Sequence, residues 1–236
     1  MSSIFKSVKI NDIHMLNDLG LALSRTDCVQ PPEPKINSID IPGADGIIDL
    51  TESLVGRTLY NNRIITMEFG RGLEKNKWPT MYSKVQSLFH GKQVKVIFDD
   101  DAEYYYSGRA AISDYTRTQM LGTMVITVNA DPYKYEMYGG LDDWLWDPFS
   151  FQTGIIRSYK DIVVSGTRNI RIIGRDKVIV PLIISNAAMT VTFKGTKYNV
   201  VAGNNKIYDI EILEGDNTLT FTGNGLISID YRGGIL

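Results

Sequence analysis

Along much of the chain, apolar and polar positions alternate with a period of two, which predicts β-strands. In RIITMEF, Ile65, Met67 and Phe69 alternate with Thr66 and Glu68, so successive side chains would face opposite sides of a strand. The same alternation recurs at Val94, Val96 and Phe98, and at Met124, Ile126 and Val128. These segments are expected to form strands that share a core.

One segment has a helical pattern instead. In WPTMYSKVQSLFHG, apolar residues recur every three or four positions and would form a single stripe on a helix. The stripe consists of Trp78, Met81, Tyr82, Val85, Leu88 and Phe89. Pro79 suits the first helical turn, and Gly91 suits the position just past the helix end. The segment predicts one helix that packs on the core.

The last third of the chain contains two hairpin-like patterns. In NTLTFTGNGLISIDY (217–231), two alternating runs flank Gly-Asn-Gly, which is typical of a hairpin turn. A second hairpin of similar design is expected at residues 189–200. Together they predict a compact antiparallel sandwich.

Two stretches look irregular. CVQPPEPKINSIDIPGADG contains four prolines, so it is expected to be extended. It is either a plain surface connection or an interaction segment, because long loops in folded domains are often functional. In DPYKYEMYGGLDDWLWDP, Gly139-Gly140 and an acidic, aromatic patch separate two strand-rich regions. This places a domain boundary there, giving domains 1–140 and 141–236.

Composition and charge argue against several classes of function. The net charge is −2 and the pI is about 5.7, which argues against a general attraction to nucleic acid. Cys28 is the single cysteine, so an internal disulfide and a cysteine-based zinc site are excluded. The N-terminus has no apolar signal-peptide core, and VIVPLII is too short to span a bilayer. No membrane insertion is expected, and the chain is expected to be made in a reducing cytoplasm.

The sequence offers little catalytic chemistry. His14 and His90 are the only histidines, too few for a histidine-rich metal site, and any Ser-His-Asp triad would need one of them. His90 is expected at the helix C-terminus, where a cation complements the dipole. GRGLEK fails the dinucleotide-binding pattern because Lys75 takes the third glycine position. We therefore name no catalytic, cofactor-binding or metal-binding residues and expect no enzyme.

The stretch IFDDDAEYYYSGRA crowds Asp99, Asp100, Asp101 and Glu103 together. A calcium site would need ligands staggered around a bend, whereas these residues separate two alternating runs. The pattern favours a solvated hairpin tip between strands. A hydrolase that uses this cluster would instead require a cleft around it.

Four segments, taken in order, resemble one known family. They are PGADGIIDLTESLVGRTLYNNRIITMEF (42–69), HGKQVKVIFDDDAEYYYSGRAAISDY (90–115), GTMVITVNADPYKY (122–135) and GDNTLTFTGNGLISIDYRGGIL (215–236). The ordered set resembles the distal tail protein (Dit) family of long-tailed, siphovirus-type bacteriophages and prophages.

The resemblance implies a fold that is mainly β. It implies an N-terminal β-sandwich or barrel-like ring domain with one α-helix, followed by a C-terminal galectin-like antiparallel β-sandwich. It also implies a structural hub of the virion tail tip or baseplate, made as a homo-hexameric ring in the host cytoplasm. Such a ring joins the tail tube protein to the tail-associated tip or lysin protein and to receptor-binding or baseplate proteins. DNA passes through its lumen without specific binding.

Within that picture, segment 30–46 is expected to contact a neighbouring subunit, and the acidic tip 99–103 to face an adjacent ring or the lumen. The main alternative is a carbohydrate-binding β-sandwich protein that uses Trp144, Trp146 and Tyr198, although core or interface packing is the more common role of such residues. A hydrolase is a more distant third hypothesis.

Overall fold

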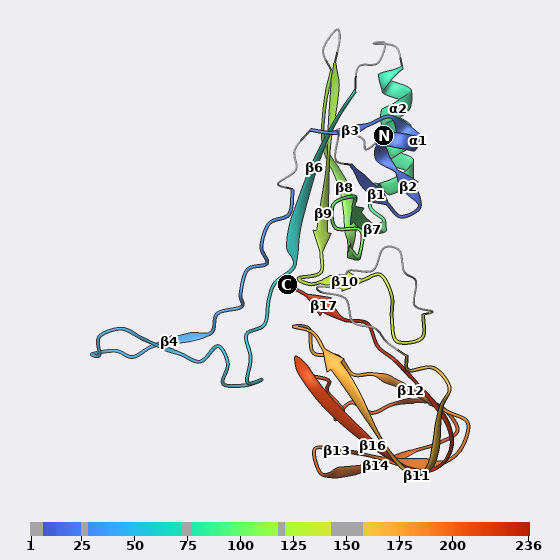
Figure 1. Cartoon of the computed structure of the whole chain (residues 1–236). Coiled ribbons are helices and arrows are strands. Elements are labelled where there is room, and N and C mark those ends of the chain that lie inside the picture. Colours follow the sequence, from blue (N-terminus) through green and yellow to red (C-terminus); the bar gives the residue numbers. More distant parts are fainter. Residues whose placement is uncertain (1–6, 25–27, 72–76, 118–120, 143–157) are drawn as a thin grey trace. The chain divides into compact units, whose positions relative to one another are not determined.

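The computed structural model describes residues 7–24, 28–71, 77–117, 121–142 and 158–236. Residue contacts group the chain into two units, which are drawn together in Figure 1: Met1–Asp101 with Tyr106–Pro132, and Ala102–Tyr105 with Tyr133–Leu236. Both units consist mostly of antiparallel strands, which confirms the predicted mainly β class. The domain boundary at residue 140 stays a prediction.

The first unit is organised around one antiparallel sheet. In spatial order its strands are β2 (Ile13–His14), β1 (Val8–Ile10), β7 (Gln93–Phe98), β8 (Tyr104–Arg117), β9 (Gly122–Ala130), β6 (Arg63–Arg71) and β3 (Ala22–Leu23). The alternation seen in the sequence is confirmed, because Ile65, Met67 and Phe69 are fully buried. Residues from β7, β8 and β9 join them in one core.

The predicted helix is confirmed as α2 (Trp78–Phe89), with Trp78, Val85 and Phe89 buried. Gly91 follows it with φ +73°, a backbone conformation that glycine adopts without strain. A second helix, α1 (Met15–Leu19), buries Met15 and Leu19 and was not predicted. Five residues are too few to show a helical period.

The two histidines have local structural roles. The Nδ1 of His14 accepts a hydrogen bond from the Asn17 amide and so caps α1. The Nδ1 of His90 accepts one from the Ile112 amide at 3.1 Å. The predicted place of His90 at the helix C-terminus is confirmed, because it is the C-cap residue of α2, and its ring links this end of the helix to β8. A charge there that complements the helix dipole stays a prediction.

The second unit contains a six-stranded sheet. Its strands are β14 (Thr196–Val200), β13 (Met189–Phe193), β16 (Gly215–Asp230), β12 (Leu182–Ser185) and β15 (Gly203–Lys206), with β11 (Ile162–Gly174) also pairing with β16. The hairpin expected at 189–200 is confirmed as β13 and β14. Its turn residues, Lys194 and Gly195, both have positive φ.

The other expected hairpin was wrong. Gly223, Asn224 and Gly225 lie inside β16, which runs unbroken for 16 residues and pairs with β11 along its length. The two glycines allow the backbone of β16 to lie close to Met189 and Asn186. A Cβ added to Gly223 would lie 2.6 Å from the Met189 Cβ, and one on Gly225 would lie 2.5 Å from the Asn186 Oδ1. The chain therefore uses glycine for space here, where the sequence pattern indicated a turn.

Strand β8 begins in the second unit. Its first residues, Tyr104 and Tyr105, pair with β10 (Lys134–Glu136), and β10 pairs in turn with β17 (Gly234–Ile235). Tyr105 stacks on Tyr135 with ring centroids 5.5 Å apart. From Tyr106 onward β8 belongs to the first unit.

Candidate functional site

The proline-rich segment forms an extended arm, defined here as residues 29–61. Strands β4 (Ser38–Asp40) and β5 (Ile47–Asp49) pair within it as a separate two-stranded sheet, which Figure 1 shows projecting beyond β6. The root of the arm is held by a bridge between Val29 and Ile65. The extended conformation predicted from the prolines is confirmed, whereas the pairing of the two halves had no signal in the sequence.

Many large aliphatic side chains on the arm are exposed. Leu54 is 87% exposed, Ile36 70% and Ile47 68%, and Ile39, Ile41, Ile48 and Val55 are also exposed. An isolated two-stranded hairpin is marginally stable at best in water, and clustered exposed apolar residues mark interaction sites. The arm therefore has the character of a docking element.

The two faces of the arm hairpin differ. Ile39 lies opposite Ile48, so one face is aliphatic. On the other face Asp40 lies opposite Ile47, and Ser38 opposite Asp49. Hydrogen bonds from the Thr51 side chain and then its backbone amide hold the pKa of Asp49 below its usual value. The second face thus combines exposed carboxylates with an exposed isoleucine.

The acidic stretch at 99–103 is the tip of the β7–β8 hairpin, as predicted. The Asp101 amide donates to the Phe98 carbonyl, and the Asp99 amide to the Ser7 carbonyl. The carboxylate of Asp99 also lies 3.3 Å from the Nε2 of His14. Among the described residues, no group of three or more His, Cys, Asp or Glu side chains is placed to hold a metal ion.

The tyrosines after this tip are buried sheet residues. In the second unit the Lys134 ammonium lies 4.3 Å from the Tyr104 ring centroid. In the first unit the Arg63 guanidinium lies 5.4 Å from the Tyr106 ring. Burial raises the pKa of Tyr106 and lowers the pKa of Arg63. Tyr104 and Tyr106 thus each lie beside a cation, whereas Tyr105 between them stacks on Tyr135.

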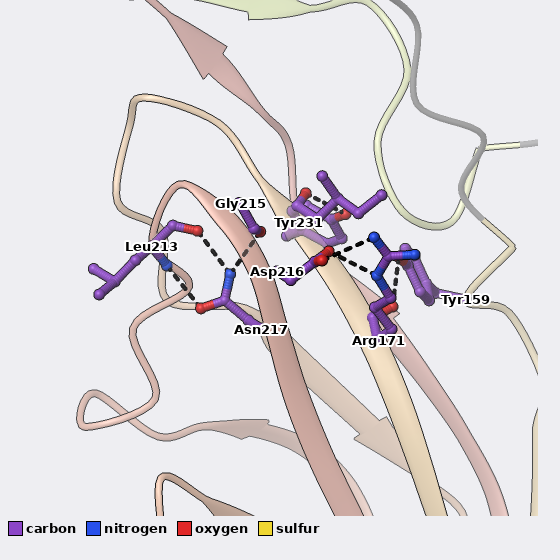
Figure 2. A network of polar contacts seen from close by, with 8 residues as sticks. Tyr159, Arg171, Leu213, Gly215, Asp216, Asn217 and Tyr231 are labelled. Carbon is purple, nitrogen blue, oxygen red and sulfur yellow. Dashed lines mark hydrogen bonds and ion pairs between the residues drawn. The ribbon is translucent and has the colours of Figure 1, made fainter.

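The second unit carries a polar network at one end of β11 and β16 (Figure 2). The Arg171 guanidinium donates to both carboxylate oxygens of Asp216, at 2.6 and 2.8 Å. The Tyr159 hydroxyl donates to the Arg171 carbonyl, and the Tyr231 hydroxyl to the Ile173 carbonyl. Hydrogen bonding to Arg171 lowers the pKa of Asp216.

The other half of Figure 2 is a turn held by one amide. The Asn217 Oδ1 accepts from the Leu213 amide, and its Nδ2 donates to the carbonyls of Leu213 and Gly215. Asn217 is almost fully buried, so its side chain replaces the backbone partners that the turn lacks. These contacts hold the paired ends of β11 and β16 together and close the turn that precedes β16.

The residues considered for sugar binding do not form a described platform. Trp144 and Trp146 lie outside the described residues. Tyr198 is half-buried and packs against the core of the second unit. The carbohydrate-binding alternative stays a prediction.

No protein-family model matches the sequence, and neither does any curated protein. Among solved structures, the chain is similar to the crystal structure of the SPP1 Dit protein (gp 19.1), with a TM-score of 0.61 and 12% sequence identity. The match covers 98% of this chain and 99% of that chain. The chain has the Dit fold.

The Dit fold agrees with the resemblance found in the sequence, and it extends over both units. SPP1 Dit is described as a paradigm of the hub adsorption apparatus in phages that infect Gram-positive bacteria. In the described part of the chain, no helix is long and apolar enough to cross a membrane.

Proposed function

We propose that this protein is a structural, non-enzymatic subunit of a phage tail hub. The observation that carries the proposal is the match of the whole chain to SPP1 Dit, a hub protein, across 98% of its residues. The exposed aliphatic arm supports it independently, because such a surface needs a protein partner. Fold alone does not fix function, so the arm is the second, site-level argument.

In the assembled form, six copies make a closed ring at the distal end of the tail. The ring joins the tail tube protein to the tip protein and to the receptor-binding or baseplate proteins, and DNA passes through its lumen. A ring of identical subunits uses heterologous contacts, so each chain needs two different faces. The arm supplies one of them. The net charge of −2 suits a channel through which DNA slides without binding.

The second unit is proposed to be the galectin-like domain, which docks a separate receptor-binding protein. Its antiparallel sheet packs around an apolar core of its own, which supports a separately folded docking domain. Glycan-array binding that is specific, saturable and lost on mutation of exposed aromatic residues would favour the carbohydrate-binding alternative instead.

Light scattering across a range of protein concentrations tests the assembly. The subunit mass is 26.5 kDa, so a ring of six copies has a mass of about 159 kDa. That mass, with rings visible by negative-stain electron microscopy, is the expected result. A monomer both alone and with the tube and tip proteins would contradict the proposal.

Shortening the arm tests its role directly. We expect a variant that replaces residues 38–49 with a short Gly-Ser linker to remain folded, because this hairpin pairs only with itself, but to lose the ring. The matched control is Lys84→Glu on the exposed side of α2, which leaves the arm intact. Rings that form normally without the hairpin would remove the arm from the assembly.

A further inference from the structure

We propose that the arm of one copy docks on the outer face of the first unit's sheet in a second copy. This inference rests on the proposed function and adds the identity of the receiving surface. The outer face is the side of β6, β7, β8 and β9 opposite the core, where the alternate side chains of each strand point.

Strand register defines this outer face row by row. One row pairs Gln93 with Arg109, Arg109 with Asn129, and Asn129 with Ile64. The next row pairs Ala111 with Thr127 and Thr127 with Thr66. Arg109, Ala111 and Thr66 are exposed. The second row is thus a shallow strip of small side chains beside a row with a cation.

The strip of small residues has the right shape to receive Ile47 of the arm. Two β-layers pack face to face at about 10 Å when their side chains interdigitate. Small residues such as Ala111 and Thr66 leave room for one large side chain from above. Ile47 is 68% exposed on the acidic face of the arm and has the size and exposure to fill that room.

The charges on the outer face and on the arm favour one orientation of the docked arm. The outer face carries Lys95, next to Ser107 in the register, and Arg109, so its β7–β8 side is basic. The acidic arm face carries Asp40 beside Ile47, with Asp49 two positions further along β5. With Ile47 on the strip of small residues, the two carboxylates approach the basic side. Opposite charges arranged in this way set orientation and register.

A second copy fits as the donor of the arm better than the same chain does. The arm leaves its own sheet at the Val29–Ile65 bridge, and about 15 residues separate that bridge from the hairpin turn. An extended chain of this length spans about 50 Å, which is larger than a domain of this size. The arm and the receiving face are also different surfaces, as a closing ring requires.

Engineered cysteines test this contact. The native Cys28 is buried, so surface cysteines report contacts cleanly. Two variants, Ile47→Cys and Ala111→Cys, are purified separately, and one of them carries a size tag. The mixed variants are then oxidised under assembly conditions. We expect a disulfide between a tagged and an untagged chain, on the order of tenfold more abundant than with the control Lys84→Cys on α2, because docking raises the local thiol concentration.

The outcomes separate the two proposals. Rings of six copies in which the Ile47→Cys and Ala111→Cys chains do not crosslink would overturn the docking inference and leave the hub function standing. A double variant that closes only within one chain, with no crosslink in the mixture, would assign the strip to the chain's own arm and also overturn it. Absence of rings in every partner combination would count against both.

A charge swap provides a second test that needs no cysteine. Asp40→Arg and Arg109→Asp are each expected to weaken assembly, shifting the concentration for half-maximal ring formation upward on the order of tenfold. The double variant D40R/R109D is expected to recover most of that loss. Equal and additive losses without recovery would show that the two residues do not face each other.

Discussion

Asn205 and Asn217 share three equivalent hydrogen bonds in two separate turns, and the Asn205 Nδ2 also donates to the Ile183 carbonyl. The Oδ1 of Asn205 accepts from the Val201 amide, and its Nδ2 donates to the carbonyls of Val201 and Gly203. Asn217 repeats this pattern with Leu213 and Gly215. The two turns share the spacing of a first residue, a glycine two positions on, and an asparagine two positions later.

We expect Asn205→Ala and Asn217→Ala each to lower the free energy of unfolding by about 2–3 kcal/mol. Each change leaves one amide and two carbonyl groups of a turn without their side-chain partner, and partly buried polar groups are costly to leave unpaired. Urea unfolding followed by circular dichroism measures the loss. The neighbouring exposed Asn204 is the matched control, and a similar loss in Asn204→Ala would show that the turns do not depend on these amides.

Gly122 leaves space for the Trp78 ring. A Cβ at residue 122 would lie 2.1 Å from the Trp78 Cε2, and Trp78 is fully buried. Gly122→Ala is therefore expected to cost about 2–4 kcal/mol of unfolding free energy, because β9 or α2 must move. Gly70→Ala is the control, since its Cβ would meet nothing closer than 3.9 Å. Near-ultraviolet circular dichroism and denaturant unfolding report the effect, and equal stability of the two variants would refute it.

The Arg171–Asp216 ion pair gives a pH-dependent prediction. The pKa of Asp216 is lowered from its ordinary value of 3.8, so its contribution to stability is present above that value and is lost as the pH falls through the lower folded-state pKa. Both side chains are exposed, so the effect is small and is reduced by salt. We expect the Tm of wild-type protein to exceed that of Asp216→Asn at pH 7, and the difference to shrink below pH 3.8. A difference that does not change with pH would point to packing instead.

Arg63 is buried, and its Nε and Nη2 have no hydrogen-bond partner among the described residues. Within the described part of the chain, Tyr106 is the polar neighbour that contacts this guanidinium. A desolvated guanidinium with two of its three nitrogens unpaired is costly, so an apolar side chain of similar length is expected to fit as well or better. Arg63→Met is expected to be at least as stable as wild type, whereas Arg63→Ala loses about 2–4 kcal/mol because it leaves a cavity. Thermal unfolding of the three proteins distinguishes this from a stabilising role of the charge, in which both variants would be weaker.

Local patterns in the sequence predicted local structure well. Helix α2 and the hairpin around Asp99–Asp101 were predicted because each depends on neighbouring residues: a single apolar stripe, and alternation on both sides of a polar tip. The Gly-Asn-Gly segment led to the wrong prediction of a hairpin turn, and the reason is physical. Glycine serves both turns and close approach, and only the position of residues 186–189 decides that Gly223 and Gly225 serve the latter.

The candidate site was less predictable. Proline content predicted that the arm is extended, yet the pairing of Ile39 with Ile48 and their exposure depend on how the arm stands away from its own core. The Arg171–Asp216 pair joins residues 45 positions apart, which no local pattern records. Contacts of this kind follow from the register of β11 and β16, and that register is set by the whole sheet.

Strand β8 is divided between the two units, and this division limits how the gene for this protein can recombine with related genes. Tyr104 and Tyr105 pair with β10, whereas Tyr106 and the residues after it pair with β7 and β9. A single crossover near residue 133 would transfer the C-terminal unit without the strand segment on which β10 builds. Viable exchanges between related genes are therefore expected to inherit the tyrosine-rich segment and the C-terminal unit from the same parent.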